Sequence, residues 1–405
     1  MRREDFPILN ELVNNRPLVY LDNAATTQKP QAVLDAILEA YSKWNANVHR
    51  GVHHLSQVAT QKHEEARKIV ADFIHAKTEE EIIFTKGATD SINMLAWSFG
   101  EAMVKEGDEI VVSELEHHSN IVPWQMLCER KKAVLKVIPQ REDLSLDIEA
   151  FKGLLSERTK LVSVAQVSNL LGIVNPIEEI IRLAHERGIP VCVDGAQSVP
   201  HLAVDVQVLD CDFLVFSAHK MYGPTGLGVL YGKKEWLDKL PPVEGGGEMI
   251  EHVRFEKTTY NVLPYKFEAG TPNYVGSYAF GKAIEYMQLV GLEEIANHEH
   301  ELTLYLEDQL MALPNVRVYA AGLSKAGAVS FNVYRMDGAL IHPFDVGVLL
   351  DRQGVAVRTG HHCAEPLIEH LQVPGTVRAS VALYNTKEDI DVFIAALKKA
   401  IRMLE

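Results

Sequence analysis

The sequence predicts an α/β protein with a large, mainly parallel sheet and a smaller α+β domain, and three observations lead to this fold class. Between residues 81 and 219, short apolar runs alternate with helix-like segments, which is typical of parallel strands joined by crossover helices. The chain has 405 residues, enough for two domains. Two long helices enclose a strand-like run near the C-terminus. We therefore expect a large domain over 15–285 and a small domain formed by 1–14 and 286–405.

The individual elements follow from hydrophobic periodicity. Apolar residues recur at helical spacing first at 30–44 and 55–74. The strands of the large domain are expected at 81–85, 109–114, 134–139, 161–167, 190–196 and 213–219. Helices are expected between them at 88–104, 118–132 and 176–188, the last delimited by Pro176 and Gly188. The small domain should contain a helix at 293–314, a strand at 326–334 and an amphipathic helix at 387–405.

Composition narrows the class of protein. Hydrophobic residues make up 47% of the chain and charged residues 23%, close to the globular average. A net charge of -15 argues against a general binder of nucleic acids or anionic membranes. No apolar run reaches the length needed to span a bilayer, and residues 1–17 do not have the pattern of a secretory signal. Four irregularly spaced cysteines fit a reducing compartment, so we expect a cytoplasmic protein.

Polar residues that directly follow predicted strands are the first candidates for a site, because ligands bind beyond the carboxyl ends of strands in open α/β sheets. Asp194 could keep the ring nitrogen of pyridoxal phosphate (PLP) protonated, with Gln197 near the ring hydroxyl; alternatively, Asp194 is a helix cap. Lys220 precedes a loop rich in glycine and could bind the cofactor covalently, although most lysines are solvated surface charges. His117 could stack on the cofactor ring, or be structural.

A phosphate group could bind where the strand at 81–85 turns into a helix. The backbone N–H groups of Ala88 and Thr89 and the Thr89 hydroxyl would meet an anion there, and Ser217 and His219 are candidates to help. An ordinary strand-to-helix turn would give the same pattern.

Cys363 is the candidate nucleophile. It follows the strand-like run 354–358, and Arg358, His361 and His362 flank it, which would favour the reactive thiolate. Binding of a metal by the adjacent histidines and the cysteine is the weaker alternative, since consecutive residues rarely all reach one ion, and we expect no metal. Arg378, on the run 377–386, could bind a carboxylate through two hydrogen bonds or form a surface ion pair.

Taken together, these motifs resemble the class V aminotransferase-like PLP enzymes and, more closely, the SufS-type (group II) cysteine desulfurases and selenocysteine lyases. The resemblance covers nearly the whole chain through LDNAATTQKP, NVHRGVHHLS, SELEHHSNIVPWQ, VSNLLG, VDGAQS, SAHKMYGPTG, EGGGEMI, FEAGTPN, RTGHHCAEP and RASVALYNT. It implies the PLP-dependent fold type I, as in aspartate aminotransferase, and a homodimer with the active site at the subunit interface.

The resemblance also implies residue roles. Lys220 looks like the lysine that binds PLP, Asp194 like the partner of the pyridine nitrogen, Gln197 like that of the ring hydroxyl, and His117 like the stacking histidine. The implied phosphate ligands are Thr89, Ser217, His219 and, from the other subunit, Thr271, with Ala88 where many relatives have a threonine. Asn169 and Arg378 look like the groups that hold the substrate carboxylate, and we place Arg358 with them. Cys363 looks like the residue that becomes the persulfide.

The implied reaction converts L-cysteine to L-alanine and leaves sulfur on Cys363. An acceptor protein of the SufE or SufU type would then take the sulfur, for iron–sulfur cluster assembly, and His342 is either a ligand offered to the zinc of SufU or an ordinary loop histidine. L-selenocysteine is a second implied substrate. The alternatives are another class V reaction, such as transamination or a kynureninase-like cleavage, which has no need for Cys363, and a non-catalytic sulfur-carrier scaffold.

Overall fold

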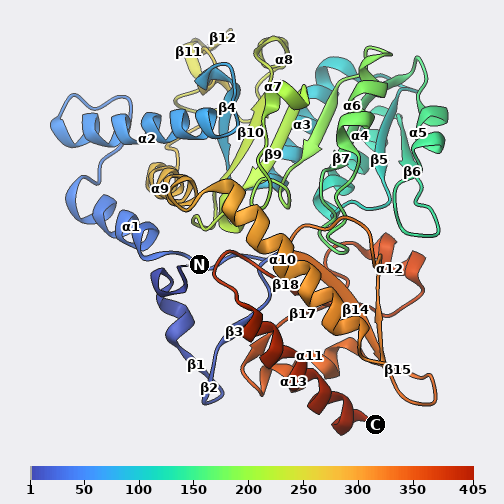
Figure 1. Cartoon of the computed structure of the whole chain (residues 1–405). Coiled ribbons are helices and arrows are strands. Elements are labelled where there is room, and N and C mark those ends of the chain that lie inside the picture. The colour runs from blue at the N-terminus through green and yellow to red at the C-terminus, as the bar shows by residue number, and fades with distance from the viewer. Residues whose placement is uncertain (1) are drawn as a thin grey trace.

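The computed structural model describes residues 2–405, and a seven-stranded sheet forms the centre of its larger unit (Figure 1). All strands run in the same direction except β10, which is antiparallel to both of its neighbours. In spatial order the strands are β4 (Ile82–Thr85), β10 (Gly228–Gly232), β9 (Phe213–Ser217), β8 (Val191–Asp194), β7 (Thr159–Ala165), β5 (Glu109–Ser113) and β6 (Val134–Ile138). The prediction of a mainly parallel sheet is confirmed.

The two faces of this sheet belong to two different hydrophobic cores, because successive side chains of a strand point to opposite sides. In β5, Val111 packs in one core, and Ile110 and Val112 pack in the other. The first face is covered by α5 (Ile148–Leu154), α6 (Ile177–His185) and α7 (Val206–Leu209), and the second by α3 (Ala88–Met103), α4 (Val122–Lys131) and α8 (Lys234–Lys239). Burial on both sides explains why the strands read as continuous apolar runs.

Four further helices follow, and one of them leads from the larger unit to the smaller one. The helices α1 (Gln31–Lys43) and α2 (His54–Phe73) pack against α9 (Tyr274–Val290). At Gly291, which has a φ of +100° that favours glycine, the chain turns into α10 (Leu292–Met311). Figure 1 shows α10 running diagonally from the larger unit into the smaller one.

The smaller unit has its own sheet and its own core. The sheet consists of β13 (Val316–Val318), β14 (Ala328–Tyr334), β18 (Thr376–Ser380) and β17 (Arg358–Gly360), with β15 (Leu340–Ile341) at its side. The helices are α11 (Pro343–Asp351), α12 (Glu365–Leu371) and α13 (Lys387–Leu404), which begins at a capping box formed by Thr386 and Asp389. The strands β16 (Val355–Ala356) and β3 (Val19–Tyr20) pair in parallel and bring the N-terminal segment onto this unit.

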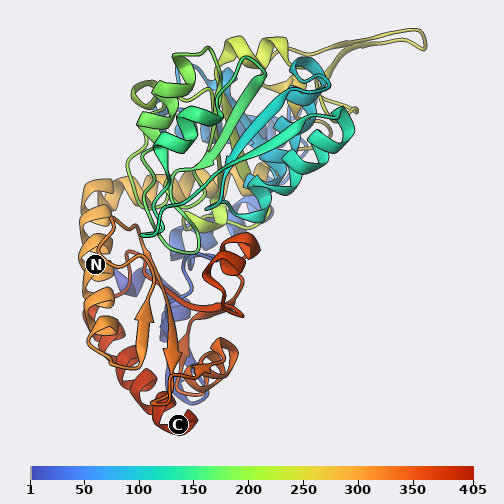
Figure 2. The same ribbon diagram turned by 90° about the vertical axis from the view of Figure 1, so that its right-hand side faces the viewer.

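The remaining elements are short. They comprise a two-stranded sheet of β1 (Leu12–Val13) and β2 (Arg16–Pro17), a hairpin of β11 (Ile250–Val253) and β12 (Thr258–Tyr260), and 3-10 turns at Arg3–Asp5, Pro7–Asn10, Glu79–Glu81, His118–Asn120, Ala218–Lys220 and Tyr265–Phe267. Figure 2 shows the hairpin projecting from the larger unit. Among the residues described, no helix is both long and apolar enough to cross a membrane.

One expected helix differs from the structure, and the expected domain boundaries stay open. The helix expected at 118–132 is divided into a 3-10 turn at His118–Asn120 and α4, whose first turn contains Pro123. Proline fixes the start of a helix and cannot donate a hydrogen bond to the preceding turn, which explains the break. The domain boundaries stay a prediction. In the structure Phe6 packs in the core of the larger unit, and Val19 and Leu21 pack in that of the smaller unit.

Candidate active site

A cavity of about 160 Å³ lies between the two units, at the carboxyl ends of the parallel strands. The larger unit contributes residues that follow β5, β7, β8 and β9 and the first residues of α3, and the smaller unit contributes residues of β17, β18 and the loop before α12. Most of the predicted site residues line this cavity: Ala88, Thr89, His117, Asn169, Asp194, Gln197, Ser217, His219, Lys220, Arg358 and Arg378. The topology therefore brings together residues from segments far apart in the sequence.

Lys220 and Asp194 form the charged centre of the cavity. Lys220 lies in the 3-10 turn that follows β9, and Asp194 is the last residue of β8, the strand paired with β9. Burial lowers the pKa of the Lys220 ammonium to about 8, Asp194 opposes this shift, and Arg378 and Arg358 add to it. Burial raises the pKa of the Asp194 carboxyl, against the hydrogen bond from Ala196 N–H and the charge of Lys220. A lysine in this state is partly neutral near pH 8 and can act as a nucleophile.

His117 lies four residues beyond the end of β5, directly before the 3-10 turn at His118–Asn120, and is neutral. Burial and the charge of Lys220 lower its pKa to about 3. Its Nδ1 accepts a hydrogen bond from the backbone N–H of Ser119 at 3.1 Å, so the proton of the neutral ring is on Nε2. The ring can therefore stack on an aromatic ligand and donate one hydrogen bond from Nε2.

The start of α3 forms an anion-binding turn. Its N-cap residue is Gly87, which supplies no side-chain acceptor, so the helix has no cap from its own N-cap residue. Ala88 N–H donates to Ser217 Oγ at 2.8 Å, which ties the turn to the end of β9. A Cβ on Gly228 would meet the Cα of Gly87 at 2.4 Å, so this turn requires glycine on the neighbouring strand β10. An adjoining hollow is lined by Lys86, Gly87, Ala88, Thr89, Asp90, Asn93, Ser217, His219, Thr225 and Gly226.

Arg378 provides the opposite wall of the cavity. Its guanidinium donates to the carbonyl of Asn169 at 2.6 Å and to Asp22 Oδ1 at 3.4 Å, and its Nε is buried without a partner among the described residues. Burial lowers the pKa of Arg378 to about 10, and Asp22 opposes the shift, so the group keeps its charge at neutral pH. The unpaired Nε and the buried Oδ1 of Asn169, which also has no partner, are polar atoms left for a ligand.

Cys363 lies on the loop between β17 and α12, beside the cavity. It is half-buried, unlike Cys128, Cys192 and Cys211, which are buried. The charge of Cys363 opposes the lowering of the pKa of both Lys220 and Arg378. The thiol is therefore close enough to the cavity to act on its charged groups. His362 lines the cavity, and burial lowers the pKa of its ring to about 3.

Two predicted residues lie elsewhere. Thr271 is exposed and does not line the cavity of its own chain, so its implied contact with the phosphate in a second subunit stays a prediction. His342 caps α11, because its Nδ1 accepts from Phe344 N–H at 3.3 Å.

The predicted residue Gln197, by contrast, lines the cavity, and its amide donates to the carbonyl of Ala24 at 2.7 Å.

Sequence reasoning missed several residues that organise the site. Asp22 pairs with Arg378 from the N-terminal segment, and nothing in its local sequence indicates this partner. Glu116 is buried directly before His117 and accepts hydrogen bonds from Ser113, Asn120 and the N–H of Ala165, while burial raises its pKa to about 7. His118, also missed, contacts the cysteine loop. A signal existed only for Glu116 and His118, through their position beside His117.

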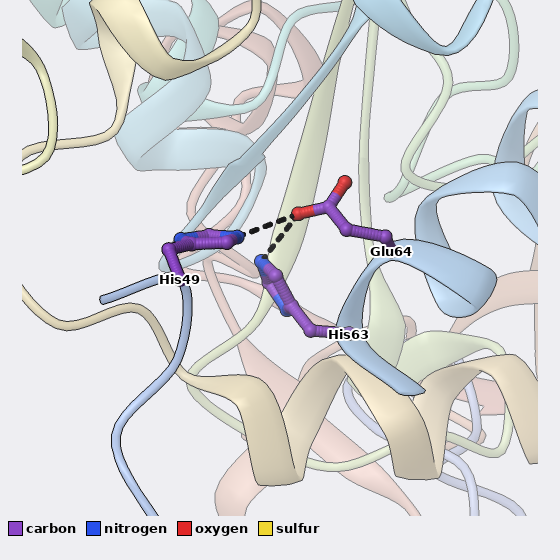
Figure 3. Close-up of side chains that lie close together, drawn as sticks. All are labelled: His49, His63 and Glu64. Atoms are coloured by element: carbon purple, nitrogen blue, oxygen red, sulfur yellow. Dashed lines mark hydrogen bonds and ion pairs between the residues drawn. The ribbon is translucent and has the colours of Figure 1, made fainter. Parts of the chain in front are cut away.

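A second cluster of ionisable residues lies outside this cavity, where His49, His63 and Glu64 come together (Figure 3). His49 Nε2 and Glu64 Oε1 are 2.9 Å apart, and His63 Nε2 is 3.8 Å from the same oxygen. Arg67 lies against the cluster, with a guanidinium nitrogen 3.2 Å from His63 Nε2 and its Nε donating to Glu64 at 2.9 Å. Because Glu64 is already paired with the buried Arg67 and with His49, the cluster is better described as an ion-pair network than as a metal site.

Comparison with known proteins identifies the family. The class-V aminotransferase family matches residues 19–393. This chain belongs to that family. A probable cysteine desulfurase of Halalkalibacterium halodurans is 51% identical over 97% of this chain and 96% of its own length. A cysteine desulfurase of an Enterobacter species is 49% identical over 99% of this chain and 98% of its own.

Solved structures of cysteine desulfurases agree with the arrangement of the two units. The apo structure of a cysteine desulfurase from Thermococcus onnurineus has a TM-score of 0.93 at 41% identity, covering 99% of this chain and 98% of its own. The Escherichia coli cysteine desulfurase CsdA, as its S-sulfonic acid, has a TM-score of 0.91 at 38% identity, covering 100% and 98%. The prediction of the PLP-dependent fold type I is confirmed.

The cofactor of this class-V enzyme is PLP, and the residues of the cavity fit it. Asp194 Oδ1 accepts from Ala196 N–H at 2.9 Å, and no donor in the described part of the chain reaches Oδ2, which can accept from a protonated ring nitrogen. The uncapped start of α3 suits the phosphate group, and Lys220 suits the aldehyde carbon. His117 can cover the face of the ring.

Proposed function

We propose that this enzyme is a cysteine desulfurase that transfers sulfur from L-cysteine to Cys363. The observation that carries the proposal is the position of a half-buried thiol beside a cavity that already contains Lys220, Asp194 and Arg378. A reaction that only moves an amino group has no use for this thiol. The identity of 51% to a probable cysteine desulfurase supports the same conclusion.

Binding of the amino acid is the first task of the protein. The free Nε of Arg378 and the second N–H of the Asn169 side-chain amide would donate to the α-carboxylate, which places the Cα next to Lys220. When bound, PLP supplies an electron sink for the bonds around that carbon. The Lys220 amine, partly neutral because burial lowers its pKa to about 8, would accept the Cα proton.

The second task is sulfur transfer. The Cys363 thiolate attacks the sulfur of the substrate, so an S–S bond forms and the Cβ–S bond breaks, with its electron pair kept by carbon. Cβ then takes the proton that left the Cys363 thiol, for which the His117 ring beside the cavity is a relay, and Lys220 returns its proton to Cα. The thiol and L-cysteine thus become a Cys363 persulfide and L-alanine, and no further oxidant or reductant is required.

The finer points of this proposal concern partners. We expect a homodimer in which Thr271 reaches the phosphate site of the other subunit, and a cytoplasmic location. We also expect a SufE- or SufU-type acceptor that delivers sulfur to iron–sulfur cluster assembly, and L-selenocysteine as a second substrate. The side chain of His342 caps α11 through Nδ1, and among residues 2–405 its Nε2 has no hydrogen-bond partner and is available to an acceptor.

The test compares alanine and sulfide release from L-cysteine, under reducing conditions, by wild type, Cys363→Ala and Cys128→Ala. We expect wild type and Cys128→Ala to be active, because Cys128 is buried in α4 away from the cavity, and Cys363→Ala to lose nearly all activity. Equal activity of Cys363→Ala and wild type would favour another class-V reaction. An inactive wild type that binds PLP would favour the scaffold function.

A further inference from the structure

His118 makes two hydrogen bonds to the loop that carries Cys363. Its backbone N–H donates to the carbonyl of Cys363 at 2.7 Å. Its ring nitrogen Nε2 accepts from the backbone N–H of Glu365 at 3.0 Å, so the proton of the neutral ring is on Nδ1. One residue of the larger unit therefore holds the backbone of the smaller unit on both sides of Ala364.

The loop needs such external contacts. His362 has a φ of 53° and Cys363 a φ of 56°, so two successive residues other than glycine adopt the unfavourable left-handed conformation. The helix α12 begins at Glu365 without a side-chain cap from its own N-cap residue, Ala364. His118 Nε2 takes the place of that cap, because it accepts the first N–H of the helix.

The contacts of the loop lead directly to the rest of the site. His118 is bonded covalently to His117, which lines the cavity, and Asn169 donates from its side chain to the carbonyl of His362 at 2.6 Å. The carbonyl of Asn169 in turn accepts from Arg378. The backbone around Cys363 is thus tied to a residue on the cofactor side and to a residue on the substrate side.

We propose that His118 is a positioning residue that fixes the Cys363 thiol relative to the cofactor and the substrate. The proposal rests on the proposed function, in which Cys363 accepts the sulfur. His118 is not among the residues that line the cavity; it acts by holding the loop in its left-handed conformation. Loss of the imidazole would free the loop, so the thiol would become more accessible to reagents from solvent and less productive toward bound L-cysteine.

Three substitutions at His118 distinguish the length of the side chain from its functional group. The amide oxygen of His118→Gln lies where Nε2 lies and can accept from Glu365 N–H, whereas that of His118→Asn lies near the Nδ1 position and falls short. His118→Ala removes the side chain. Each variant keeps the backbone N–H that donates to Cys363, and glutamine and asparagine carry the same functional group, so they form a matched pair.

The primary measurement is backbone hydrogen–deuterium exchange of residues 361–368 in the PLP-loaded protein. The second is the rate at which iodoacetamide alkylates Cys363, followed by mass spectrometry; the buried Cys128, Cys192 and Cys211 should react slowly. We expect both rates to rise about five-fold in His118→Ala and His118→Asn, as for the loss of one hydrogen bond, and to stay near wild type in His118→Gln. Alanine formation should fall in the first two variants and recover in the third.

The outcomes distinguish this proposal from the proposed function. If wild type forms no alanine from L-cysteine, the proposed function fails, but exchange and alkylation still report on the loop. Exchange and alkylation rates in His118→Ala and His118→Asn that match wild type would overturn the role of His118, and so would a His118→Gln variant as mobile as His118→Ala. The visible absorbance of bound PLP and the melting temperature check that His117 and the fold are intact in each variant.

Discussion

At the scale of the single residue, the protonation of Lys220 should control how fast the protein binds its cofactor. Because burial lowers its pKa to about 8, the neutral amine becomes about tenfold scarcer for each pH unit below that value. We expect the rate of PLP binding to the apoprotein, followed by visible absorbance, to rise with pH up to about 8 and then level off. In Arg358→Met the midpoint should move to higher pH, since Arg358 helps to lower the Lys220 pKa. An unchanged midpoint would contradict that electrostatic effect.

Some residues of the site could be predicted from the sequence, and others could not. Lys220, Asp194 and His117 could be predicted because each follows a predicted strand, and the ends of parallel strands meet at one edge of the sheet. Asp22 could not be predicted, and for His118 the position beside His117 was the only signal. Their importance lies in contacts to Arg378 and Glu365, which are remote in the sequence, and such contacts leave no local pattern.

At the scale of the element, the turn before α3 depends on its neighbour β10. In Gly228→Ala the new Cβ would lie 2.4 Å from the Cα of Gly87, so the turn must move away from the end of β9. We expect PLP affinity, measured by titration of the apoprotein, to fall at least about tenfold as the phosphate contacts are lost. Gly153→Ala is the control, because an added Cβ meets no atom within 4 Å at that position of α5. Equal affinities of the two variants would show that the turn tolerates the displacement.

The ion-pair network on α2 should make stability depend on pH. Burial alone would raise the pKa of Glu64, but the hydrogen bond from His49 and the charge of Arg67 lower it to about 2. The pKa of His49 is raised by its hydrogen bond to Glu64. The stabilisation by Glu64 is therefore present above the ordinary glutamate value of 4.5 and is lost as the pH falls toward 2, whereas that by His49 is present below the ordinary histidine value of 6.5 and is lost as the pH rises through its folded pKa.

It follows that Glu64→Gln should lower the free energy of unfolding most between about pH 4.5 and 6.5, by roughly 3 kcal/mol. Urea denaturation over a pH series measures the difference from wild type. Glu65→Gln, on the exposed side of the same helix, should have little effect at any pH. A pH-independent difference for Glu64→Gln would mean that packing, and not charge, links α2 to His49.

Among the elements, α9 shows the limit of periodicity as a signal. The helix was not predicted, and most of its residues are buried because α1 and α2 pack against it. A helix that is apolar on all sides has no contrasting polar face, so its 3.6-residue period is hard to detect. By contrast α6 and α13, each with one face to solvent, were predicted almost to their ends.

At the scale of the whole molecule, the exposed Thr271 offers a test of the subunit arrangement. Because it does not line the cavity of its own chain, it can affect PLP only through a second copy. We expect Thr271→Ala to weaken PLP binding about tenfold, as for the loss of a hydrogen bond to a charged group, without changing the mass in light scattering from twice that of the chain. Thr78→Ala, another exposed threonine, is the control. An unaltered affinity would argue against the contact.

The adjacency of His117 and His118 has a consequence for delivery of the product. One residue borders the cofactor pocket and the next holds the loop of Cys363, and consecutive Cα atoms are only about 3.8 Å apart. Under the proposed function, a persulfide on Cys363 could move outward only if both hydrogen bonds between its loop and His118 were broken. We therefore expect an acceptor protein to insert its own nucleophile into the mouth of the cavity.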